Sequence, residues 1–273
     1  MAGGDACGPA LKILDDILAA KRADLPRLRA LARQAAPRPR APRRAFDALR
    51  RDAGQPLRLI AEIKRRSPSA GPLSMVLSAG DRARAYAEAG ATMVSVLADT
   101  PFFAGGWEDV REAAEALCDA AVGVLAKEFV VDPVQVDLAE ATGADLVLVI
   151  ARILPDDGLL RALVDRSRAA GIEALVEVAS EPELERALAA GARIVGVNAR
   201  DLDTLVVDVG RAHALSRGVP DGVVSLHLSG LRSDNDVRTV ARGRSDGALV
   251  GEILMREDDP RPLLRSYTLA ANG

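Results

Sequence analysis

The sequence predicts a (β/α)8 barrel of the TIM type, in the α/β class, with a helical extension at its amino terminus. Short apolar runs rich in β-branched residues recur eight times, and most are separated by one amphipathic, helix-like stretch. Strands that are apolar on both faces and alternate with helices are typical of a parallel sheet covered on its outside. The length of 273 residues suits this barrel, which usually needs about 250.

The first part of the chain precedes any strand pattern. An amphipathic helix is expected near Leu11 to Leu31, followed by the Arg-rich and Pro-rich segment APRPRAPRRAF from Ala36 to Phe46. We expect this segment to be a solvated linker, in preference to a phosphate-binding arm. Residues 1–50 should therefore pack on the barrel as a helix and linker, and residues 51–273 should form the barrel, in a single domain overall.

The predicted strands follow in order from LRLIAEI. They are residues 57–63, 92–98, 123–129, 145–151, 173–179, 193–199, 222–230 and 247–255. Helix-like stretches lie between most of them, at residues 81–90, 107–118, 133–143, 157–171 and 181–191, and several end in glycine, as helices often do. A doubly wound open sheet is the structural alternative. It would normally carry a GxGxxG turn after an early strand, and the sequence contains none.

Composition excludes several classes of protein. A net charge of −3 and an aromatic content of 3% do not suit a nucleic-acid surface, which needs positive charge and stacking rings. The sequence has no apolar run of about 18 residues, so we expect no membrane span. The start MAGGDACGPALKILDD has acidic residues where a signal peptide needs basic ones. We therefore expect a cytoplasmic protein, either a monomer or a weak homodimer.

Cysteine and histidine are too few to indicate a metal site. Cys7 and Cys118 lie far apart in the sequence with no histidine near them, so we expect free thiols. The only histidines are His213, expected at the surface of a helix, and His227, expected to be packed inside a strand. We expect neither a metal nor a cofactor.

Lysine is rare here, occurring only as Lys12, Lys21, Lys64 and Lys127, while every other basic residue is arginine. A surface lysine can be replaced by arginine at little cost. A site that needs an ammonium able to give up its proton cannot accept arginine, because the guanidinium stays charged. Lys64 and Lys127, both at predicted strand ends, are therefore candidates for chemistry.

Polar side chains interrupt the strands near their carboxyl ends, where the active site of such a barrel lies. These residues are Glu62, Lys64, Lys127, Glu177, Asn198 and Ser229. Strand alternation places Glu62 and Lys64 on one face. A single Glu-Lys pair could be a structural ion pair. Two lysines, two carboxylates and an amide from four strands favour a functional pocket.

Glycine and serine cluster after three strands and indicate a phosphate site. The segments are SGLRS from Ser229 to Ser233, VGE from Val250 to Glu252, and SPSAG with Ser67, Ser69 and Gly71. Small residues let backbone N–H groups approach an anion, and the loops after the last two barrel strands commonly bind phosphate. We expect a phosphorylated small-molecule substrate. A buried lysine near its carbonyl permits either acid/base carbon–carbon bond formation or an aldolase-like imine mechanism.

The motifs resemble those of the indole-3-glycerol phosphate synthase family over nearly the whole chain, in order. AEIKRRSPSAG is similar to the family's AEIKxxSPSxG, SVLADTPFFAGGWEDV to SVLTDxxFFxGSxEDL, and VLAKEFVVDPVQV to VLxKDFIxDxYQI. The segments ADLVLVIARIL, LVEVASEPELERALAAGARIVGVNARDL and LVGEILM continue the resemblance, as does the amino-terminal ILDDILAAKRADL. The family closes the indole ring of 1-(2-carboxyphenylamino)-1-deoxyribulose 5-phosphate, with loss of carbon dioxide and water and without a cofactor.

The resemblance implies a role for each matching residue. Lys127 would be the general acid on the ribulose carbonyl, and Glu177 the general base for dehydration. Lys64, oriented by Glu62, would hold the substrate carboxylate, while Asn198 would position a ribulose hydroxyl. The matching substrate-contact residues are Ser67, Gly230 and Gly251 at the phosphate, Phe103 and Phe129 beside the aromatic ring, and Ser229, Glu252 and Arg200, the last without an assigned role.

One position departs from the family pattern. Where the family has ESG after the seventh strand, this chain has LSG, so Leu228 replaces a pocket carboxylate. Leucine cannot accept a hydrogen bond, which would leave a substrate partner unpaired at a cost of about 1–3 kcal/mol. Glu128 in KEF, for KDF, is a milder change, and His227 stands where the family tends to have a small residue. Three hypotheses follow: the usual reaction at a lower rate, an altered substrate in specialised metabolism, or a structural subunit without activity.

Overall fold

Eight parallel strands close into a barrel, which confirms the predicted fold. The computed structural model describes residues 9–67, 71–202 and 204–273, with side chains from residue 13 onward, so Cys7 and Ser69 lie outside the described residues. The barrel order is β1-β10-β9-β8-β7-β6-β5-β4. The barrel strands are β1 (Arg58–Ile63), β4 (Met93–Leu97), β5 (Gly123–Lys127), β6 (Leu146–Ile150), β7 (Glu173–Val178), β8 (Ile194–Asn198), β9 (Val224–Leu228) and β10 (Gly247–Val250).

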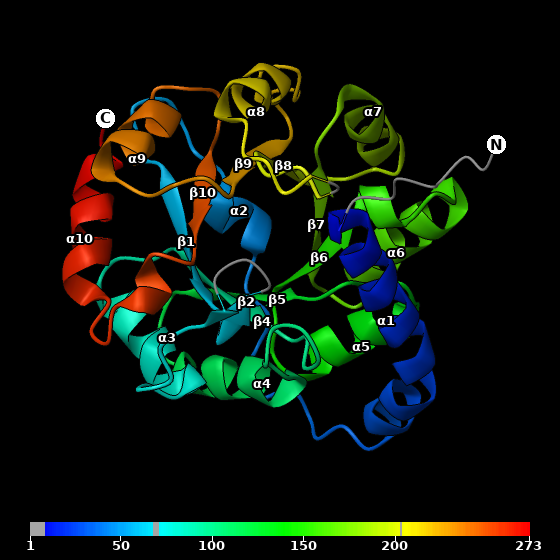
Figure 1. Cartoon of the computed structure of the whole chain (residues 1–273). Helices are drawn as coiled ribbons and strands as arrows, with labels where there is room; N and C mark the ends of the chain where they lie inside the picture. The colour runs from blue at the N-terminus through cyan, green and yellow to red at the C-terminus, as the bar shows by residue number, and fades with distance from the viewer. Residues whose placement is uncertain (1–8, 68–70, 203) are drawn as a thin grey trace.

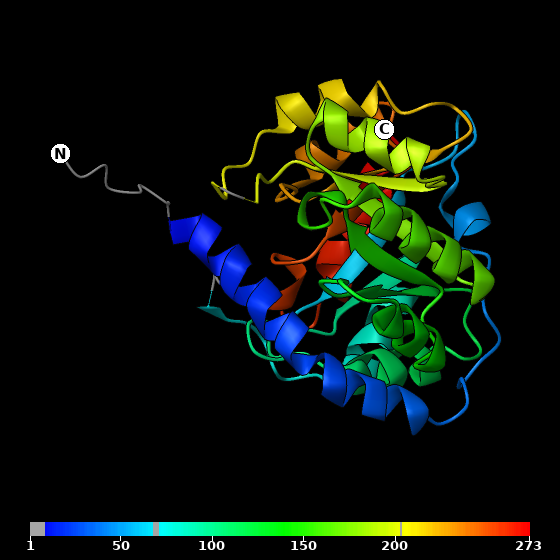
Figure 2. The ribbon, with the colours of Figure 1, turned by 90° about the vertical axis from the view of Figure 1, so that its right-hand side faces the viewer.

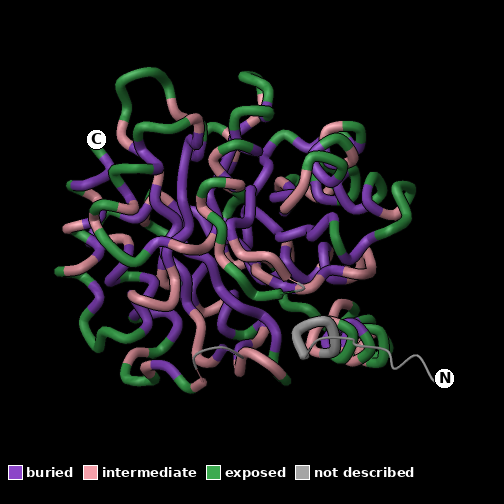
Figure 3. Tube along the Cα trace, turned by 45° about the horizontal axis from the view of Figure 1, so that its top comes forward, coloured by how far each residue is buried: buried purple, intermediate pink, exposed green. Residues whose placement is uncertain are grey.

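Helices cover the outside of the barrel and form a ring around the strands in Figure 1. They are α3 (Ala79–Glu88), α4 (Trp107–Ala116), α5 (Pro133–Ala141), α6 (Asp157–Ala169), α7 (Glu181–Ala189), α8 (Val209–Ser216), α9 (Asp234–Ala241) and α10 (Arg261–Ala270), with 3-10 turns at η1 (Ala151–Ile153) and η2 (Leu254–Arg256). Buried residues follow the strands and the inner faces of these helices (Figure 3). The core therefore lies inside the barrel and between barrel and helices.

The last two predicted strands are shorter than expected. The run at 222–230 forms a strand only over β9, which ends at Leu228, because Ser229 and Gly230 both adopt positive φ angles of 70° and 85°. The run at 247–255 ends as a strand at Val250 and continues into η2. A separate small hairpin, β2 (Arg66–Ser67) with β3 (Gly71–Pro72), follows β1. Irregular backbone thus replaces strand at the end of the barrel where the polar residues gather.

The amino-terminal segment packs against the barrel. Helix α1 (Pro9–Arg33) lies along α5 (Figures 1 and 2), and the short α2 (Ala45–Leu49) buries Ala45 and Leu49. The expectation of a solvated linker between them is wrong for three of its arginines. Arg38 and Arg40 pair with the fully buried carboxylate of Asp145, and the backbone N–H of Arg43 donates to it at 2.8 Å. The guanidinium of Arg43 donates to carbonyls at the end of α4.

Asp145 therefore fastens the linker to the base of the barrel, since it also accepts the N–H of Val124 at 2.9 Å. Asp145→Ala should lower the free energy of unfolding by about 3–5 kcal/mol, because it leaves buried cations without their partner. Asp47→Ala, which removes an exposed pair with Arg44, should cost under about 1 kcal/mol. Urea unfolding of both variants checks the difference, and equal losses would contradict this role for Asp145.

Candidate active site

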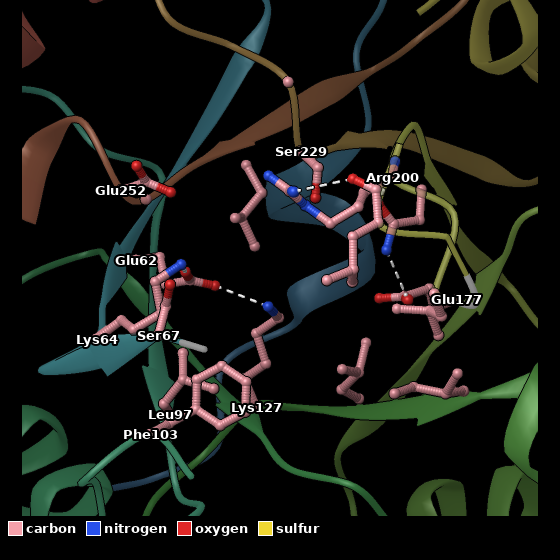
Figure 4. A pocket seen from close by; sticks show the side chains of 18 of the residues that line it. Glu62, Lys64, Ser67, Leu97, Phe103, Lys127, Glu177, Arg200, Ser229 and Glu252 are labelled. Carbon is pink, nitrogen blue, oxygen red and sulfur yellow. Dashed lines mark hydrogen bonds and ion pairs between the residues drawn. The ribbon is translucent and has the colours of Figure 1, made fainter. Parts of the chain in front are cut away.

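A cavity of about 490 Å³ opens at the carboxyl ends of the barrel strands. Its described lining residues include every residue matched to the family's catalytic and substrate-contact positions except Leu228, whereas Gly71 of the expected phosphate segment does not line it. Figure 4 shows side chains from opposite strands pointing into this space. The structure therefore brings these residues together in one cavity at the strand ends.

Glu62 lies on one side of the cavity between two lysines. It is 1% exposed, and its carboxylate oxygens lie 2.8 Å from the Nζ atoms of Lys64 and Lys127, one each. Lys64 follows β1 and Lys127 is the last residue of β5, so the three side chains come from two strands that flank β4. A Cβ at position 251 would come within 2.5 Å of the Glu62 carboxylate. Gly251 therefore has to lack a side chain for Glu62 to fit.

Glu177 and Asn198 lie across the cavity on neighbouring strands β7 and β8. The Asn198 amide donates to Glu177 Oε1 at 2.8 Å, and its own Oδ1 accepts the backbone N–H of Arg200 at 2.9 Å. Both side chains are buried, at 5% and 6% exposure. Asn198 thus holds the Glu177 carboxylate in one orientation.

The two carboxylates of the cavity, Glu62 and Glu177, differ in the direction of their pKa shifts. Burial would raise the pKa of Glu62, but the charges of Lys127 and Lys64 lower it to about 2. Burial opposes the charge on Lys127, yet Glu62 and Glu177 raise the pKa of this lysine above its usual value. Burial raises the pKa of Glu177 in spite of Lys127 and Asn198. Glu62 therefore stays ionised, Lys127 is an ammonium able to donate a proton, and Glu177 is the better proton acceptor of the two carboxylates.

A rim of small and cationic residues surrounds the rest of the opening. Ser229 and Gly230 turn the backbone after β9 through left-handed conformations, and a Cβ at Gly230 would approach Val207 to 3.0 Å. Glu252 is paired with Arg256 at 2.8 Å, which lowers the pKa of this glutamate. The cationic residues of the lining are Lys64, Lys127, Arg200, Arg232 and Arg256, and Ser67 also belongs to it. Such a rim can accommodate an anion.

The third side of the cavity is apolar. The rings of Phe103 and Phe129 have centroids 6.0 Å apart with a 34° angle between their planes. Ile13, Leu14 and Ile17 of α1 also line the cavity, as do apolar residues of the barrel such as Leu148. Sequence reasoning missed the contribution of α1, although the spacing of Ile13 and Ile17 by four residues already placed them on one helix face.

Leu228 is not brought into the cavity wall. It is 2% exposed, and its side chain lies so close to Gly196 that a Cβ there would come within 2.6 Å of it. It is the register partner of Asn198 on the neighbouring strand. Leu228 therefore fills the barrel interior beside the site, where the family motif would place a carboxylate.

The two histidines, His213 of α8 and His227 of β9, pack against each other. Their ring centroids are 5.6 Å apart in an edge-to-face arrangement, and His227 is fully buried. The expectation that His227 is packed inside the protein is confirmed. His213 was expected at the surface, but it is only partly exposed. Burial and the nearby His213 lower the pKa of His227 to about 4.

Within the described residues, no group of three or more His, Cys, Asp or Glu side chains could hold a metal ion. None of the described helices has the length and apolarity of a membrane span. Fold and site together define a (β/α)8-barrel protein with paired lysines and separated carboxylates at its carboxyl-terminal mouth, suited to acid/base chemistry on an anionic small molecule.

The comparisons with known proteins identify the family. The family model for indole-3-glycerol phosphate synthase matches residues 14–267. The chain is 43% identical over 258 residues to the indole-3-glycerol phosphate synthase of Kineococcus radiotolerans, covering 92% of this chain and 93% of that protein. It is 40% identical over 263 residues to that of Mycobacterium ulcerans, covering 94% of each. The chain belongs to the indole-3-glycerol phosphate synthase family.

Solved structures of other barrels agree with the fold. A 3-hexulose-6-phosphate synthase matches with a TM-score of 0.62 at 18% identity, covering 78% of this chain and 99% of that one. A thiamine phosphate pyrophosphorylase from Pyrococcus furiosus matches with a TM-score of 0.61 at 18% identity, covering 81% and 98%. At these identities the likeness concerns the barrel alone.

The lowered pKa of His227 makes folding stability depend on pH. His227 binds a proton near pH 6.5 in the unfolded chain but only near pH 4 in the folded chain. Its contribution to the free energy of unfolding is therefore complete above pH 6.5 and is lost as the pH falls towards 4. His227→Asn should remove about 2 kcal/mol of the stability loss between pH 7 and pH 5, whereas His213→Asn should keep most of it. Urea unfolding at both pH values measures this. An unchanged pH dependence in His227→Asn would refute the assignment.

Proposed function

We propose that this chain converts 1-(2-carboxyphenylamino)-1-deoxyribulose 5-phosphate into indole-3-glycerol phosphate. The observation that carries the proposal is the Glu62 carboxylate bound by Lys64 and Lys127 at 2.8 Å each, across the cavity from the Glu177–Asn198 pair. This arrangement provides a charged acid on one side of a substrate and a base on the other. The named relatives support the same reaction.

Lys127 would act first, as the general acid. As the substrate's aromatic carbon attacks the ribulose carbonyl, the carbonyl oxygen gains negative charge and takes a proton from Lys127. Lys64, fixed by Glu62, would pair with the substrate carboxylate until the bond to the ring breaks and carbon dioxide leaves. A lysine whose pKa is raised stays protonated, which favours this acid/base route over an imine, since an imine needs a neutral amine.

Glu177 would act in the dehydration. After ring closure the hydroxyl formed from the ribulose carbonyl leaves as water with a proton from Lys64, since Lys127 has given its proton to that oxygen, while Glu177 takes a proton from the new ring. Its raised pKa suits a carboxylate that must accept a proton. Asn198, which holds Glu177 at 2.8 Å, would also position a ribulose hydroxyl.

The remaining cavity residues would bind the two ends of the substrate. Phosphate would bind at Ser67, at the backbone of Ser229, Gly230 and Gly251, and near Arg200. The backbone N–H of Glu252, rather than its carboxylate, would face the anion, because the carboxylate is paired with Arg256. Phe103 and Phe129 would contact the carboxyphenyl ring, supported by their place on the apolar side.

Residues 1–50 and the barrel at 51–273 would work as one domain. The contacts of Arg38 and Arg40 with Asp145 and the α1 residues in the cavity lining support this. The oligomeric state expected from the sequence, a monomer or a weak homodimer, stays a prediction. Leu228 is the position that departs from the family pattern, and we propose that it slows this reaction rather than changing the substrate. The other residues that match the family still line the described cavity.

Lys127→Met tests the proposal. Loss of the general acid should lower turnover about 10²–10⁴-fold. Arg193→Met is a matched control, since it removes a cation paired with Glu173 at the opposite end of the barrel strands. The assay is the fluorescence of the indole product, with circular dichroism to check the fold. Turnover by Lys127→Met close to that of the unaltered chain would contradict the assigned role, and no product from the unaltered chain would contradict the function.

A further inference from the structure

Lys21 of α1 forms a buried ion cluster that the proposed chemistry does not use. Its Nζ lies 2.7 Å from Asp99 Oδ2, and 2.9 Å and 3.0 Å from the two carboxylate oxygens of Glu128. All three residues are buried, with exposures of 5%, 0% and 2%. Among the described residues, Lys21 is the only cation paired with either carboxylate. One ammonium therefore joins the amino-terminal helix to the ends of β4 and β5.

The same two carboxylates hold the backbone of the aromatic residues. Asp99 Oδ1 accepts the N–H groups of Phe102 at 2.7 Å and Phe103 at 3.0 Å. Glu128 Oε1 accepts the N–H of Phe129 at 2.7 Å. Phe103 and Phe129 face each other on the apolar side of the cavity. The positions of both rings thus depend on carboxylates that Lys21 holds together.

Lys21 also fixes the helix that covers this side. Ile17 lies one turn before Lys21 on the same face of α1, and Ile13 one turn before that, and both line the cavity with Leu14. Anchoring Lys21 therefore places an apolar stretch of α1 in the lining of the cavity that also contains the two phenyl rings.

We propose that Lys21 is a positioning residue for the aromatic half of the substrate, acting through Asp99 and Glu128 to hold both phenyl rings and the apolar face of α1 around it. This inference rests on the proposed function. Without Lys21, two buried carboxylates would face each other without a counter-charge, and like charges repel. The backbone N–H bonds that they accept would then be strained or lost, and the rings would shift, while the Glu62 and Glu177 side of the cavity would keep its contacts.

Burial raises the pKa of Glu128 to about 7 even with Lys21 beside it. Removal of the ammonium would therefore favour a neutral Glu128, which ends the repulsion from Asp99 but still disturbs the contact with Phe129. A neutral carboxyl accepts the N–H of Phe129 less strongly than a carboxylate does, which is a second reason for the ring to loosen.

The test compares Lys21→Met with Arg29→Met. Arg29 also links α1 to the barrel, through Asp132 at 2.8 Å, but its side chain is 53% exposed and does not line the cavity. Lys21→Met should raise KM for the carboxyphenylamino substrate roughly 10- to 100-fold, with kcat changed less than about 3-fold. Arg29→Met should change neither. Circular dichroism and thermal melting show whether each variant is folded at the assay temperature.

Ribulose 5-phosphate, which lacks the aromatic ring, separates positioning from a general loosening of the barrel. Its inhibition constant against the reaction should be the same in Lys21→Met and in the unaltered chain. A rise in this constant equal to the rise in KM would overturn the inference, and so would an unchanged KM in Lys21→Met. If the unaltered chain forms no indole product, the proposed function fails instead.

Glu128→Gln provides the second variant if Lys21→Met does not fold. It keeps the size of the side chain, but it removes one of the two charges that Lys21 bridges. It should raise KM for the carboxyphenylamino substrate several-fold and leave the inhibition constant of ribulose 5-phosphate unchanged. A KM equal to that of the unaltered chain would overturn the inference.

Discussion

The ionised carboxylate of Glu62, buried between Lys64 and Lys127, is the constraint on which the rest of the site depends. A carboxylate at this depth is costly unless it is paired, and two ammonium groups at 2.8 Å compensate it. The pairing requires Gly251, directly after β10, because any side chain there would occupy the space of the carboxylate. It also holds both lysines in fixed positions and favours the charged form of Lys127. Residues at the ends of β1, β5 and β10 therefore have to pack together to hold Lys127, the acid of the site.

The carboxylate on the opposite side of the cavity has a raised pKa, unlike that of Glu62. Glu177 has an amide partner, and burial raises its pKa, so it can take up a proton that Glu62 cannot. The barrel separates the two carboxylates by placing them on β1 and β7, and the same topology places the apolar wall near β4 and β5. The acid and the ring-binding surface thus meet at the end of β5, whereas the base comes from β7 on the other side, which explains how one cavity can serve several steps without a change of fold.

Much of this arrangement could be predicted from the sequence. The eight strand patterns and their polar ends placed Glu62, Lys127, Glu177 and Asn198 around one mouth, because parallel strands in a barrel end on the same side. Local patterns could not give contacts between distant segments. Lys21 meets Asp99 and Glu128 only when α1 folds back on the barrel, and Asp145 meets the linker arginines for the same reason. Leu228 shows a further limit: its strand position was predicted, but neighbouring side chains decide whether it reaches the cavity.

The pH dependence of turnover in Glu62→Gln tests the central claim most directly. Glu62 raises the pKa of Lys127 against the effect of burial. Loss of its charge should therefore move the basic limb of the kcat profile to lower pH by about 1–3 units, with a lower maximal rate. Glu252→Gln, which alters a carboxylate paired with Arg256, should leave that limb in place. A basic limb in Glu62→Gln at the same pH as in the unaltered chain would contradict the account.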